Sequence, residues 1–194
     1  MIRLKSLLEQ IDGIFPSDDI IDKPGYGESG YEGIDKTPYK DYNIYNVFIS
    51  GIESDISSAA QASAFKRGYT PQTDAKNEVI LETFSKYDIA GITKFFEDPP
   101  GTIGKIVLFS AGCNLADMII NLLGPTYAGK IYCVEPWASD TNKSNWTSIP
   151  AGNFYVHPTS WHRGAGATDG SMNFTPAKQG HLANLTWAVQ QIFS

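Results

Sequence analysis

The chain lacks the features that mark nucleic-acid binding, membrane insertion or a disulfide framework. It has 15 Lys and Arg against 21 Asp and Glu, a net charge of −6, and no basic run. Phosphate contacts need a concentrated Lys/Arg surface, so we expect no nucleic-acid partner. No apolar run approaches the roughly 20 residues of a membrane span. The only cysteines are Cys113 and Cys133, for which we expect free thiols, or one bridge if their strands are neighbours.

The first 44 residues differ in character from the rest. Residues 1–12 have apolar positions at helical spacing, but charges run through them and no small-residue cleavage site follows, so no secretory signal is predicted. We expect a short helix there that docks on its own domain or on a partner. Residues 13–45 interleave Gly and Pro with tyrosines, which is typical of an extended arm lying on a surface. The sequence therefore predicts this arm at 1–44 and one domain at 45–194.

Apolar strands alternate with helices along residues 45–194. The helices are expected at 57–67, about 74–96, 113–123 and 181–193, and the strands near 46–50, 105–109, 130–134 and 153–157. Because these strands are continuously apolar, they are expected to be buried on both faces. The predicted fold is three-layer α/β, with a mainly parallel sheet of about 4–6 strands and helices on both faces.

Polar and reactive residue types gather where these strands end. Gly51, Ser110 and Glu135 each follow a predicted strand closely. Because ligands of parallel sheets bind beyond the carboxyl ends of the strands, we expect a site at this edge.

The residue types at that edge suit acyl transfer by a serine. Such chemistry needs a nucleophile, a base and an acid that orients the base, which we assign to Ser110, His181 and Asp169. The oxyanion would be held by the backbone N–H groups of Ala111 and of Gly51 in the 50–52 turn. No cofactor is expected.

These residues resemble the α/β-hydrolase fold, in particular its small cutinase-like and esterase-like members. The family motif Gly-x-Ser-x-Gly corresponds here to Leu108-Phe-Ser-Ala-Gly112, and the short interval between Asp169 and His181 is similar to the cutinase pattern. The resemblance covers roughly residues 45–194. It implies a serine hydrolase of the esterase or lipase type, which acts on an ester-type small molecule through an acyl-enzyme.

Several alternatives remain open from the sequence alone. Leu108 replaces the first glycine of the motif, and other registers would place Gly112 or Cys113 at the corner. Ser110 and His181 would also serve as helix caps. His162 is an alternative base, and Glu135 and Asp140 are alternative acids. Cys113 is an alternative nucleophile. His157 and His162, with the acids nearby, match no tight ligand spacing, so no metal site is predicted.

A second function class fits the same sequence. The chain would be a non-catalytic structural or interaction protein on a hydrolase-like sheet, held by its N-terminal arm in an assembly such as a virus or phage particle. Its partners would then be other protein chains, and the sequence leaves the oligomeric state open. We accordingly expect the chain in the cytoplasm or in a viral particle.

Overall fold

The computed structural model describes residues 43–51, 57–70, 77–137, 146, 148–156, 173–174 and 180–194. The predicted N-terminal helix and nearly all of the predicted arm lie outside the described residues.

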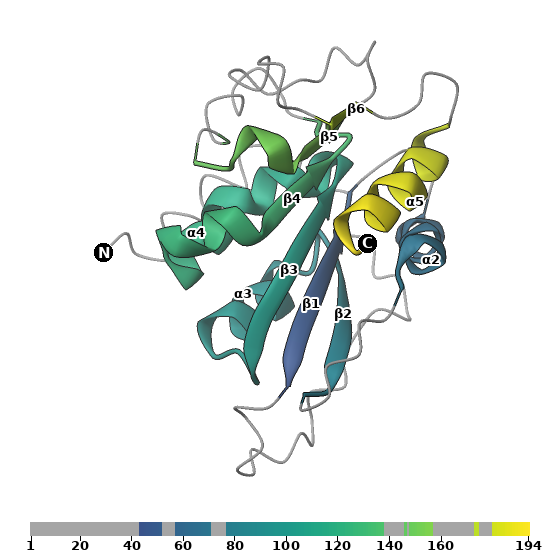
Figure 1. Cartoon of the computed structure of the whole chain (residues 1–194). Coiled ribbons are helices and arrows are strands. Elements are labelled where there is room, and N and C mark those ends of the chain that lie inside the picture. The colour runs from purple at the N-terminus through teal and green to yellow at the C-terminus, as the bar shows by residue number, and fades with distance from the viewer. Residues whose placement is uncertain are drawn as a thin grey trace, which may run out of the picture. The chain divides into compact units, whose positions relative to one another are not determined.

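A parallel sheet of six strands forms the centre of the described domain (Figure 1). Its strand order is β2-β1-β3-β4-β5-β6, and every neighbouring pair is parallel. The strands are β1 (Ile44–Ser50), β2 (Val79–Ser85), β3 (Thr102–Phe109), β4 (Ile131–Val134), β5 (Phe154–Val156) and β6 (Asn173–Phe174). All four predicted strands are therefore confirmed, and β2 and β6 are added at the two edges.

Helices cover both faces of this sheet, which confirms the predicted three-layer architecture. The helices are α2 (Ser58–Gly68), α3 (Ile89–Glu97), α4 (Ala116–Leu123) and α5 (His181–Ile192). Figure 1 shows α2 and α5 together on one face, and α3 and α4 on the other. Short 3-10 helices span Ser110–Leu115, Pro125–Lys130 and Ala151–Asn153.

One hydrophobic core lies between the sheet and the helices α2 and α5. Alternate residues of β1 and β3 point to this side, among them Phe48 and Phe109. The ring of Phe48 stacks on Phe65 of α2, with 4.5 Å between ring centroids. On the opposite face, Phe95 of α3 packs edge-on against Tyr45, 5.8 Å away. Because both faces are apolar, the strands read as continuous hydrophobic runs.

Helices α2 and α5 approach each other closely at a glycine. A Cβ atom at Gly68 would lie 2.3 Å from the carbonyl oxygen of Thr186. The Thr186 hydroxyl in turn donates to the carbonyl oxygen of Ala64 at 2.9 Å. This contact fixes α5, and therefore its first residue, His181, relative to α2.

One predicted helix is wrong. Residues 74–96 do not form a single helix, because residues 79–85 form the edge strand β2 and α3 begins only at Ile89. The segment Val79-Ile-Leu-Glu-Thr-Phe-Ser85 is rich in β-branched and aromatic residues, which favour a strand. Asp88 then caps α3, with its carboxylate accepting from the N–H of Gly91 at 2.9 Å.

The remaining predicted helices are confirmed with small shifts. The helix expected at 113–123 starts earlier, as the 3-10 helix Ser110–Leu115, and continues as α4.

In the part of the chain that the structure describes, no helix has both the length and the apolar character needed to cross a bilayer.

Candidate active site

Ser110 occupies the corner between β3 and the helix that follows it. Its backbone φ is +52°, in the left-handed region. That region costs an L-residue roughly 1–2 kcal/mol. Among the described non-glycine residues, only Ser110 and Glu135 have a positive φ, and both directly follow a strand of the sheet. Backbone strain of this kind concentrates at functional sites, so the corner is a candidate for one.

Two glycines let the corner pack against the end of β1. A Cβ atom at Gly112 would lie 2.9 Å from the carbonyl oxygen of Ile49. A Cβ atom at Gly51 would lie 2.7 Å from the Cβ of Ser110 and 2.8 Å from the amide nitrogen of Ala111. Any side chain at either position would push the corner away from β1. Gly112 stands at the second glycine position of the motif Gly-x-Ser-x-Gly.

Leu108 does not prevent the corner from forming. It is fully buried within β3, where it pairs with Ile49 on one side and Cys133 on the other. Because Phe109 points toward α2 and α5, alternation directs Leu108 toward the opposite face. The leucine therefore fills the core beneath the corner.

His181 and Glu135 meet at the same edge of the sheet. His181 is the first residue of α5, and Glu135 follows β4 directly. The imidazole Nδ1 lies 3.8 Å from a carboxylate oxygen of Glu135, a distance longer than a direct hydrogen bond. Glu135 is buried and His181 is partly buried. Because Nδ1 faces the acid, Nε2, which is buried in this structure, is the nitrogen that a catalytic triad would direct at the nucleophile.

Ser110 is joined to this pair through its chain neighbours. The Phe109 ring lies 4.4 Å from the His181 ring, measured between centroids. The backbone N–H of Trp137, two residues after Glu135, donates to the Ser110 carbonyl oxygen at 3.2 Å. Within the described residues, these contacts link the three groups, and no hydrogen bond joins the Ser110 hydroxyl to the imidazole. Catalytic hydrogen bonds often tighten only when substrate is bound.

The expected oxyanion donors differ in how they are engaged. The N–H of Gly51 donates to the side-chain oxygen of Gln61 at 2.8 Å. In this structure that hydrogen bond already occupies the N–H of Gly51. Ala111 follows the corner directly, so its N–H lies in the first turn of the 3-10 helix Ser110–Leu115. The hydroxyl of Ser50, the last residue of β1, is buried and makes no hydrogen bond to any described residue. Leaving a buried hydroxyl without a partner costs about 1–3 kcal/mol.

Cys113 is a buried thiol beneath the corner. Its sulfur donates to the carbonyl oxygen of Leu108 at 3.3 Å. Burial raises its pKa well above the usual range, and a hydrogen bond with the thiol of Cys133 raises it further. Both cysteines are free. Because the thiolate is the reactive form, Cys113 is poorly suited to be the nucleophile.

Several predicted site residues cannot be placed. The predicted acid Asp169 and the rivals His162 and Asp140 lie outside the described residues, as does His157. Of the predicted residues that are described, Ser110, Ala111, Gly51, His181 and Glu135 all lie at the carboxyl edge of the sheet. The sequence offers Glu135 only as a rival acid, yet it is the described carboxylate beside His181.

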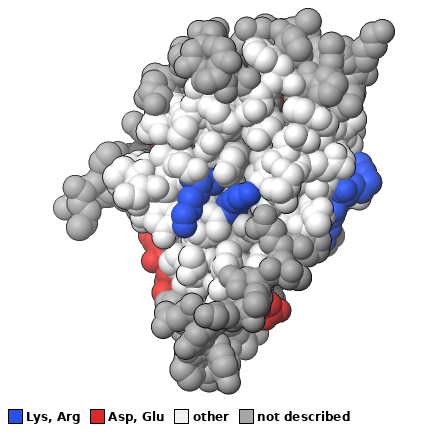
Figure 2. All heavy atoms as spheres, in the orientation of Figure 1, with Lys and Arg blue, Asp and Glu red and all other residues white. Residues whose placement is uncertain are grey.

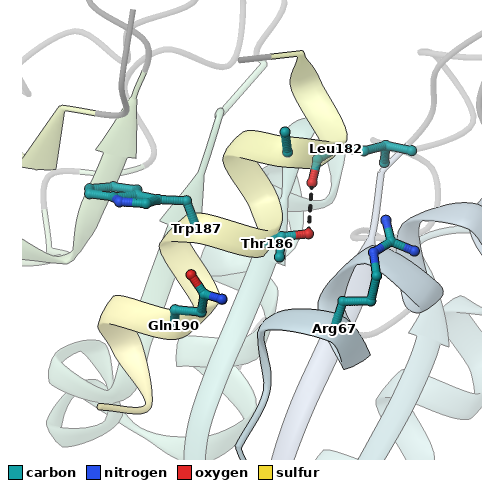
Figure 3. Close-up of a pocket in the computed structure, with 6 residues that line it drawn as sticks. Arg67, Leu182, Thr186, Trp187 and Gln190 are labelled. Carbon is teal, nitrogen blue, oxygen red and sulfur yellow. Dashed lines mark hydrogen bonds between the residues drawn. The ribbon is translucent and has the colours of Figure 1, made fainter. Parts of the chain in front are cut away.

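Neither a metal cluster nor the hollow along α5 coincides with the Ser110 corner in the part of the chain that the structure describes. Across the described segments, no group of three or more His, Cys, Asp or Glu side chains is arranged to hold a metal ion. A hollow of about 610 Å³ lies along α5, next to Arg67 of α2 (Figure 3). Its other lining residues are Leu182, Ala183, Thr186, Trp187 and Gln190. The hollow includes none of the residues at the corner, so it is separate from the candidate active site.

Comparison of the sequence and the structure with family models, curated proteins and solved structures yields no match. Function is therefore inferred from the geometry of the chain itself.

Proposed function

We propose that this chain is an α/β-hydrolase-like serine esterase that works through an acyl-enzyme. Ser110 is the nucleophile, His181 the base, and Glu135 the acid that orients the base. The observation that carries the proposal is the strained corner at Ser110, which holds φ at +52° at the edge where His181 and Glu135 meet. A serine held on a sharp strand-to-helix turn is the arrangement such enzymes use.

The order of these residues along the chain supports the assignment. The nucleophile follows β3, the acid follows β4, and the base comes last, at the start of α5. Serine, acid and histidine in this chain order characterise hydrolases of this architecture. We assign the role of the acid to Glu135 and not to Asp169, because a carboxylate oxygen of Glu135 lies 3.8 Å from Nδ1 of His181.

The proposed reaction has two steps. His181 Nε2 takes the proton of the Ser110 hydroxyl while the Ser110 oxygen attacks the ester carbonyl carbon. The N–H of Ala111 stabilises the resulting oxyanion. The ester C–O bond then breaks, and the departing alcohol takes the proton from His181. A water molecule, deprotonated by His181, attacks the acyl group, and Ser110 recovers its proton as the acid leaves.

A second candidate is a non-catalytic structural protein on the same sheet, held in an assembly. The burial of the nucleophile favours it, because Ser110 is only 3% exposed. In that case the corner would be a rigid packing feature, and the predicted N-terminal arm would carry the interaction.

Hydrolysis of 4-nitrophenyl acetate by the full chain separates these candidates. The proposal predicts hydrolysis that falls by at least about a hundredfold in Ser110→Ala and in His181→Ala. Ser85→Ala is the matched control, since Ser85 ends β2 and is not assigned to the site. Its activity should be unchanged. Equal activity in all four proteins, or none in the folded native chain, would reject the enzyme.

A further inference from the structure

Three large apolar side chains stand out as exposed among the described residues. They are Tyr87 at 59%, Trp137 at 42% and Phe174 at 46% exposure. Tyr87 comes just after β2, Trp137 comes shortly after β4, and Phe174 is the last residue of β6. All three therefore lie at the carboxyl edge, where the Ser110 corner also lies.

Of these three residues, Trp137 is the one whose backbone contacts the nucleophile residue. The backbone N–H of Trp137 donates to the Ser110 carbonyl oxygen at 3.2 Å, and β4 is the immediate neighbour of β3. Tyr87 follows β2, which is two strands from β3, and Phe174 ends β6, three strands away on the other side. With strands spaced about 4.8 Å apart, these residues are roughly 10 and 14 Å from the corner across the sheet.

The two sides of the corner have different parts in the proposed reaction. The amide of Ala111 lies beside Gly51 at the end of β1, so the oxyanion would face that side. Glu135 and the imidazole it contacts lie on the β4 side. Because the alcohol leaves by taking the proton of His181, the alcohol part of the ester must extend toward β4. Trp137 comes two residues after Glu135 and stands on that same side.

We propose that the substrate is an ester whose alcohol part carries an aromatic ring, and that Trp137 binds this ring. This inference rests on the proposed esterase function and deepens it. An indole offers a large flat apolar face, and aromatic pairs stack in offset or edge-on geometry. On the face shown in Figure 2, most of the described surface is uncharged, with a few separate basic and acidic side chains.

The test compares two series of esters on the native chain, Trp137→Ala and Trp137→Phe. In the alcohol series, methyl, butyl and benzyl acetate differ only in the leaving alcohol. In the acyl series, methyl acetate, butanoate and octanoate differ only in the acid. Initial rates are followed by titration of the released acid, with kcat and KM separated. Tyr87→Ala is the matched control, since it removes an exposed aromatic side chain from the same edge.

Trp137→Ala should lower kcat/KM for benzyl acetate about tenfold, and for methyl acetate about twofold at most. Trp137→Phe should restore most of the loss, and Tyr87→Ala should change neither series. The acyl series should keep its native order of rates. Equal losses in both series, or no loss for benzyl acetate, would overturn the role of Trp137. If the native chain hydrolyses no ester and Ser110 takes up no fluorophosphonate, the proposed function itself fails.

Discussion

Replacing Ser110 by glycine should stabilise the protein while removing its proposed nucleophile. The serine holds φ at +52°, a conformation that glycine adopts without steric cost. Ser110→Ala is the matched comparison, because alanine also lacks the hydroxyl but keeps a Cβ atom. Both variants should lose reactivity, and only glycine should relieve the corner.

The expected gain follows from two opposing terms. Relief of the left-handed conformation is worth roughly 1–2 kcal/mol. The greater freedom of glycine in the unfolded chain offsets about 0.4–1 kcal/mol of this gain. We therefore expect Ser110→Gly to exceed Ser110→Ala by about 0.5–1 kcal/mol in the free energy of unfolding.

Urea denaturation followed by circular dichroism measures this difference. With a slope of about 2 kcal/mol per molar urea, the midpoint of Ser110→Gly should lie about 0.3–0.5 M above that of Ser110→Ala. Equal midpoints, or a lower midpoint for the glycine variant, would show that the corner is not strained. The fold would then store no strain at its proposed nucleophile.

Three further predictions concern the proposed acid and two buried side chains. Glu135→Gln should lower ester hydrolysis at least about tenfold, whereas Asp169→Asn should not; the opposite result would reassign the acid. Burial lowers the pKa of Lys86 to about 8, so the folded state disfavours its charge below that pH. Lys86→Met should therefore raise the free energy of unfolding at pH 7, by about 1 kcal/mol, and urea titrations should show this gain shrinking between pH 8 and 10. Cys113 should resist iodoacetamide at pH 8 until the chain is unfolded, and rapid native labelling would contradict its burial.

Much of the fold can be predicted because the strands are buried on both faces. Continuous apolar runs such as Ile106-Val-Leu-Phe109 are fully buried and indicate a parallel sheet without further information. The edge strand β2 is harder to predict because all of its apolar residues except Phe84 are only partly buried, and because they also fit a helical stripe. Its β-branched residues, and the capping Asp88 that follows them, are the signals that distinguish the two.

The site can be predicted less completely, because its residues are far apart along the chain. Ser110 is identifiable from its place between a strand and a helix, and the structure gives it the positive φ of a corner residue. The contact between Glu135 and His181 joins residues distant in sequence, so spacing alone does not select Glu135 as the acid. Likewise, nothing in the sequence indicates that the side-chain oxygen of Gln61 accepts a hydrogen bond from the N–H of Gly51.

Labelling with a fluorophosphonate, mapped by peptide mass spectrometry, tests the proposed nucleophile without knowledge of the substrate. The reagent forms a stable adduct only with an activated serine hydroxyl, so it reports on Ser110 directly. We expect one adduct, on Ser110, in the folded native chain, absent in Ser110→Ala and strongly reduced in His181→Ala. A folded chain with no adduct, or with the adduct on another serine, would contradict the assignment of Ser110 as the nucleophile.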